Sequence, residues 1–132
     1  MKKDITNRDD VELLVNAFYA KVIADKELGH IFQEIAKVNW TTHLAAMVDF
    51  WENIILFTGS YEGNPMNLHQ HLHHIAPLNE IHFEQWNNLF IRTVDELFDG
   101  AKASLAKYRA LSISLIIKKK LLAFQWEQKE KD

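Results

Sequence analysis

Apolar side chains recur at the spacing of an α-helix along most of this chain, and few residues interrupt the pattern. Only four glycines and two prolines occur among the 132 residues. Long helical stretches separated by short breaks predict an all-α fold with no internal repeat and no linker. We therefore expect residues 1–132 to form a single domain whose ends, 1–8 and 127–132, are frayed.

The breaks divide the chain into four long helices and one short segment. The first helix is expected to follow Asn7 and to bury a stripe within residues 11–22, and the next is expected at 38–57 with Asn39 or Thr41 as its cap. Gly29 is expected to end one segment, and Asp99-Gly100 to separate helices at 79–98 and 101–128. The last helix is expected to carry an apolar stripe of five large residues, which are Leu105, Tyr108, Leu111, Leu115 and Leu122.

Composition excludes several classes of protein. Cysteine is absent, so disulfides, thiolate metal sites and a cysteine nucleophile are excluded. The net charge of −3 and the pI near 6.1 give no electrostatic support for binding nucleic acid. No stretch reaches the roughly 20 apolar residues of a membrane span, and the start does not resemble a signal peptide. We therefore expect a cytoplasmic protein that binds neither nucleic acid nor membrane.

A short segment at 66–76 concentrates histidine between the two prolines. It contains His69, His71, His73 and His74. Exposed histidines without a role are one interpretation, and a divalent metal site using His69 and His73 with a carboxylate is another. A third is a haem ligand, which requires one histidine on a short element beside an apolar slot.

Three further residues carry hydrogen-bond donors on mostly apolar helical faces. They are Tyr19, His43 and Trp86, and His43 has Met47 and Phe50 four and seven residues later. Each of the three alone is also compatible with an ordinary core residue that has a polar tip. Together with the histidine-bearing segment they favour a polar site inside an aromatic core.

Several pieces of the sequence match one family in order and spacing. They are FY at 18–19, LGHIF at 28–32, WTTH at 40–43 followed by FW at 50–51, GSYEGNPMNLH at 59–69, HFEQW at 82–86 and TVDELF at 93–98. On these pieces the chain, from about residue 11 to residue 114, resembles the group III truncated haemoglobins. That resemblance implies a two-over-two helical sandwich around haem b (iron protoporphyrin IX).

The resemblance also implies roles for individual residues. His69 matches the proximal ligand of the iron, although the long connection to Trp86 leaves His71 and His73 as substitutes. The distal polar residues, which act on the bound ligand, match Tyr19, His43 and Trp86. Residues that contact the haem are then expected to include Phe32, His43, Met47, Phe50, His69 and Trp86.

A protein of this kind is expected to bind O2 and other diatomic ligands such as CO and NO. Several donors around one ligand favour slow release, and so favour NO or peroxide chemistry with an unidentified reductase over bulk oxygen transport. A monomer or weak dimer is expected. Two other functions stay open, a haem-free helical interaction module and a non-haem protein with a histidine-bound metal.

Overall fold

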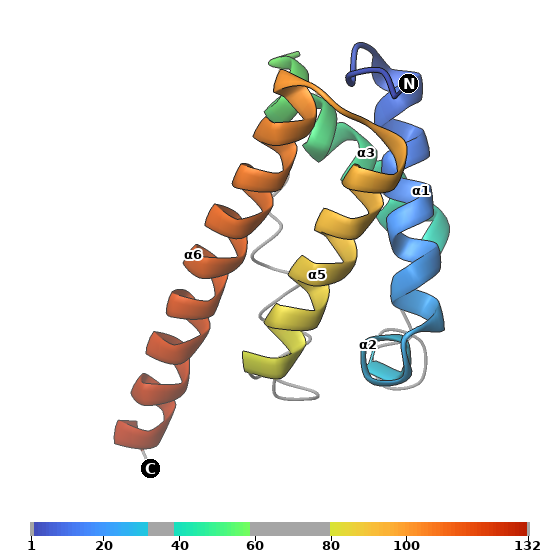
Figure 1. Ribbon diagram of the computed structural model, residues 1–132. Helices are drawn as coiled ribbons and strands as arrows, with labels where there is room; N and C mark the ends of the chain where they lie inside the picture. Colours follow the sequence, from blue (N-terminus) through green and yellow to red (C-terminus); the bar gives the residue numbers. More distant parts are fainter. Residues whose placement is uncertain (1, 32–38, 59–79, 132) are drawn as a thin grey trace.

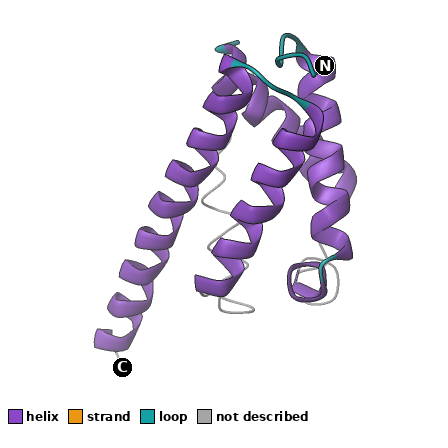
Figure 2. Cartoon of the chain, in the orientation of Figure 1, coloured by secondary structure: helices purple, strands orange, loops and turns teal. Residues whose placement is uncertain are grey.

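The computed structural model describes residues 2–31, 39–58 and 80–131, with side chains up to residue 119, and these ranges contain helices and no strand (Figures 1 and 2). The helices are α1 (Arg8–Ala24), α2 (Lys26–His30), α3 (Trp40–Leu56), α5 (Glu80–Leu97) and α6 (Ala101–Lys131). The all-α prediction is confirmed. Within the described ranges, no helix combines the length and the apolar character needed to cross a bilayer.

The beginnings of α1 and α3 follow from side chains that cap them. The Asn7 side chain accepts a hydrogen bond from the backbone N–H of Asp10 at 3.0 Å, and the Asn39 side chain accepts one from the N–H of Thr42 at 3.3 Å. Each bond satisfies a donor that the first turn of a helix leaves unpaired. Asn39, rather than Thr41, is therefore the cap of α3.

Gly29 does not end a helix, contrary to the expectation from sequence. It lies inside α2 and is buried, and the chain breaks earlier, at Asp25, which caps α2. A Cβ atom on Gly29 would lie 2.3 Å from the carbonyl oxygen of Ile23. Glycine is required here because α2 folds back tightly against the end of α1.

The long helices pack around α1. Helix α1 contacts both α3 and α5, α5 pairs with α6, and α3 also reaches α6 (Figure 1). The stripe predicted for α1 is fully buried, as expected, and consists of Val11, Leu14, Val15, Phe18 and Val22. The interior is continued by Trp51 of α3, which stacks on Phe90 of α5 with ring centroids 4.6 Å apart.

Helix α6 uses a different face from the one predicted. Tyr108, Leu111 and Leu115 are 65%, 47% and 51% exposed. The buried positions are instead mostly small, and in the described part of α6 they are Ala103, Ala106, Ala110, Ser114 and Ile117. Small side chains allow the helix axes to approach closely, and hydropathy alone ranks them below leucine and tyrosine.

The segment around Asp4 and Ile5 is held in place, although residues 1–8 were expected to fray. Ile5 is 1% exposed, and the Asp4 carboxylate accepts hydrogen bonds from the N–H groups of Lys102 and Ala103 at 2.9 and 2.8 Å. Asp4 thus caps α6 from a distant part of the chain. At the other end, α6 continues to Lys131, past the predicted end at residue 128.

Candidate functional site

Tyr19 places a phenol in the interior between α1 and α3. The residue is 4% exposed, and its ring meets those of Phe18 and His43 edge-on at centroid distances of 4.8 and 5.0 Å. Burial raises the pKa of the Tyr19 hydroxyl above its ordinary value, because the phenolate would lose its hydration. A tyrosine hydroxyl is already protonated at neutral pH, and the raised pKa keeps it a hydrogen-bond donor in alkaline solution as well.

His43 faces Tyr19 from the first turns of α3. It is 9% exposed, and its ring plane is at 84° to that of Tyr19. The Asn39 cap fixes the backbone here, since the His43 N–H donates to the Asn39 carbonyl oxygen at 2.9 Å. The structure thus brings together two residues that the sequence placed in one site, although they lie on different helices.

Trp86 reaches the same region from α5 and is half-buried. Its indole meets Phe18 edge-on at 5.2 Å and lies parallel to the ring of Phe90 at 5.7 Å, with an interplanar angle of 7°. Phe18 also touches Tyr19, so a single phenyl ring separates the indole from the phenol. Two of the three expected donors therefore contact Phe18, and the third, His43, contacts Tyr19.

Apolar residues of α3 continue the site toward the core. Met47 lies one helical turn after His43 and is 8% exposed. Phe50 is half-buried and meets Trp51 edge-on at 5.3 Å. Both residues follow His43 on α3, and both have side chains that do not compete for hydrogen bonds.

The remaining expected residues lie outside the described ranges. These are Phe32, the proximal candidate His69, and the alternative ligands His71 and His73. Among the residues that the structure does describe, no three metal-binding side chains come close enough together to hold an ion.

Trp40 also belongs to this site, although sequence reasoning assigned it only to the apolar stripe of its helix. Its ring lies 5.6 Å from that of Tyr19 and 5.8 Å from that of His43. Trp40 and His43 are three residues apart, which places both on one face of α3. This spacing could have indicated from the sequence that Trp40 lies beside His43.

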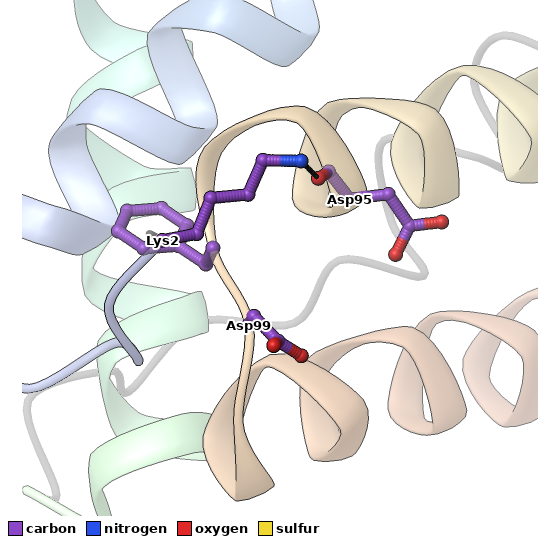
Figure 3. A pocket seen from close by; sticks show the side chains of 4 residues that line it. Lys2, Asp95 and Asp99 are labelled. Carbon is purple, nitrogen blue, oxygen red and sulfur yellow. Dashed lines mark hydrogen bonds between the residues drawn. The ribbon is translucent and has the colours of Figure 1, made fainter.

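A surface hollow of about 490 Å³ lies elsewhere, where the N-terminal segment crosses the α5–α6 turn (Figure 3). It is lined by Lys2, Asp95, Phe98 and Asp99. The Lys2 ammonium donates to the backbone carbonyl of Asp95 at 2.7 Å, and the Asp99 N–H donates to the carbonyl of Lys3 at 2.9 Å. These bonds attach the N-terminal segment to the turn, so we interpret the hollow as a structural junction.

The helical architecture, the buried phenol and imidazole and the half-buried indole are typical of the globin class. No family model matches the chain. A curated group 3 truncated hemoglobin of Campylobacter jejuni is 30% identical over 117 residues, which are 86% of this chain and 90% of that relative. The crystal structure of group III truncated hemoglobin from the same species matches with a TM-score of 0.78 at 29% identity, over 92% of this chain and 95% of that one.

This chain therefore belongs to the group III truncated haemoglobin family, as the sequence motifs predicted. Membership implies a globin with a haem cofactor and small gaseous ligands.

Proposed function

We propose that the protein binds haem b through His69 and binds O2, CO or NO on the side lined by Tyr19, His43 and Trp86. One observation carries this proposal: a buried phenol and imidazole from two helices are in edge contact, and an indole lies one ring away. Such convergence of polar groups in an aromatic interior is what a small polar ligand needs.

The described side chains fit the chemistry of a haem pocket. Haem supplies, when bound, an iron that takes up diatomic ligands. The phenol of Tyr19 is protonated at neutral pH, so it is available as a donor. Phe18 is apolar and buried and packs on the Tyr19 ring, so it helps to keep water away from that donor, and Met47 is likewise apolar and buried. A hydrogen bond is electrostatically stronger in such a dry environment than in water.

The three polar side chains have separable roles in this proposal. Tyr19 Oη and Trp86 Nε1 donate hydrogen bonds to a ligand that carries partial negative charge. His43 supplies either a donor or an acceptor, depending on which ring nitrogen holds the proton. Each charge-assisted hydrogen bond contributes about 1.5–3 kcal/mol, so two donors slow ligand release strongly.

Slow release suits a reaction of O2 with NO, or peroxide chemistry, better than bulk oxygen transport. Either reaction requires electrons from an external reductase. The test is the steady-state rate of NO consumption with a reducing partner. A rate well above that of free haem supports the proposal, and a rate equal to free haem would leave storage or sensing as the role.

The His69 assignment makes a separate prediction. We expect His69→Ala to lose haem or to lose the five-coordinate ferrous absorption spectrum, because the iron then lacks its protein ligand. His30→Ala is the matched control, since His30 is an exposed histidine at the end of α2. An unchanged spectrum in His69→Ala would transfer the ligand role to His71 or His73, and these two variants are measured alongside.

A further inference from the structure

Three aromatic rings form a closed triangle at the junction of α1 and α3. Tyr19 contacts His43 at 5.0 Å, Tyr19 contacts Trp40 at 5.6 Å, and Trp40 contacts His43 at 5.8 Å. The interplanar angles are 84°, 60° and 75°, so each pair meets edge-on or tilted. Edge-to-face contact at these distances is a favoured geometry for aromatic pairs.

Trp40 is the outermost of the three rings. Tyr19 and His43 are buried, whereas Trp40 is half-buried. Of the three rings, the indole is therefore the one that is partly exposed to solvent. It contacts both of them, so it restricts the rotation of the imidazole and of the phenol at the same time.

The backbone at Trp40 is itself fixed. Trp40 is the first residue of α3 and directly follows the cap Asn39. The bond from the Thr42 N–H to the Asn39 side chain and the bond from the His43 N–H to the Asn39 carbonyl hold the turn from both sides. The position of the indole is thus defined by the start of the helix.

We propose that Trp40 is a positioning residue of the ligand site, which holds the His43 imidazole against the Tyr19 phenol. This inference rests on the distal role proposed above for Tyr19 and His43. Trp40 acts through these two side chains and has no role of its own toward the ligand. Without the indole the imidazole gains rotational freedom, and the hydrogen bonds to the ligand are no longer preorganised.

The test uses the haem-loaded protein and two readouts, the O2 dissociation rate and the infrared C–O stretching band of the CO complex. We expect Trp40→Leu to raise the O2 dissociation rate about two- to tenfold, the range that corresponds to losing one aromatic contact. The C–O band should broaden or split, because the donors near CO then adopt several orientations. Trp40→Phe keeps an aromatic ring and should restore both readouts toward the parent values.

Two controls separate positioning from general damage. Tyr108→Leu removes an aromatic ring from the exposed face of α6 and should change neither readout. In a His43→Leu, Tyr19→Phe background, adding Trp40→Leu should change the rate less than about twofold, because residues that act through one another are not additive. Trp40→Met is the second variant if Trp40→Leu does not fold, and the same changes are expected of it.

The outcomes distinguish this inference from the proposed function. If Trp40→Leu and Trp40→Met match the parent while Tyr19→Phe releases O2 faster, the positioning role of Trp40 is wrong and the distal site stands. A full effect of Trp40→Leu in the double-variant background would also overturn it. If Tyr19→Phe and His43→Leu both match the parent, the distal site itself is wrong, and the inference fails with it.

Discussion

At the scale of single residues, the site depends on polar groups placed where water does not compete. The interior disfavours the phenolate of Tyr19 and so raises the pKa of its hydroxyl, and His43 and Phe18 pack directly on its ring. A neutral donor in an aromatic environment interacts strongly with any ligand that carries negative charge.

Removing either donor should therefore accelerate the loss of O2. We expect Tyr19→Phe and Trp86→Phe each to raise the O2 dissociation rate by about one to two orders of magnitude, the equivalent of 1.5–3 kcal/mol. Stopped-flow displacement of O2 by CO measures the rate. Tyr108→Phe, which removes an exposed hydroxyl from α6, is the control and should leave the rate unchanged. Parent rates in both distal variants would show that neither group donates to the ligand.

The sequence indicated that Tyr19 and His43 lie close together, but it did not indicate the contacts of Trp40 with them. Tyrosine, histidine and tryptophan on an apolar stripe can be identified as candidate site residues from the sequence. Their polar atoms would be buried there, and a buried polar atom needs a hydrogen-bond partner or a ligand. Trp40 was not identified as a site residue because a large aromatic ring on an apolar stripe is already explained by packing in the core. Its contacts with Tyr19 and His43 depend on the packing of α1 against α3, which sequence periodicity does not specify.

At the scale of elements, the local sequence determines where α1 and α3 begin, but it does not determine which faces of the helices are in contact. The Asn7 and Asn39 caps follow from residue type and position, and the structure has both. The buried face of α6 does not follow, because the alanines there are selected by how closely the neighbouring helices approach. Gly29 is a similar case, since its role depends on the carbonyl of Ile23, six residues earlier in the chain.

The beginning of α6 depends on a residue almost 100 positions away. The Asp4 carboxylate accepts hydrogen bonds from the backbone N–H groups of Lys102 and Ala103. Gly100 lies against this carboxylate with a φ of 141°, and there is no space for a Cβ atom at that position. We expect Asp4→Ala to lower the free energy of unfolding by about 0.5–2 kcal/mol, the usual effect of losing a helix cap. Urea unfolding measures it, and an unchanged midpoint would mean that the cap contributes nothing.

The same carboxylate should make stability depend on pH. Burial by itself raises the pKa of Asp4, but the N–H groups of Lys102, Ala103 and Ile5 outweigh it and lower the pKa overall. The pKa of Asp4 in the unfolded chain is near 3.9, and its pKa in the folded protein is lower. The stabilisation is therefore complete above about pH 5 and is lost as the pH falls through the pKa of the folded protein. Asp4→Asn should lose less stability than the parent over this acid range. Identical acid profiles for the two proteins would contradict the assignment.

At the scale of the whole molecule, the proposed ligand site is assembled from helices that are distant in sequence. Tyr19 comes from α1, Trp40 and His43 from α3, and Trp86 from α5, and the core ring of Phe18 lies among them. The packing of α1 against both α3 and α5 therefore creates the site. Arg8 strengthens one of these contacts, with its guanidinium 2.8 Å from Asp49 and 3.1 Å from the buried Glu52 of α3.

The account as a whole requires that this helical assembly hold a haem iron through one histidine. The most direct measurement is the absorption spectrum of the reduced protein, supplemented with hemin, before and after addition of CO. We predict a Soret band typical of five-coordinate ferrous haem that shifts when CO binds. A protein that takes up no hemin, or a spectrum that persists when His69, His71, His73 and His74 are all replaced, would contradict it.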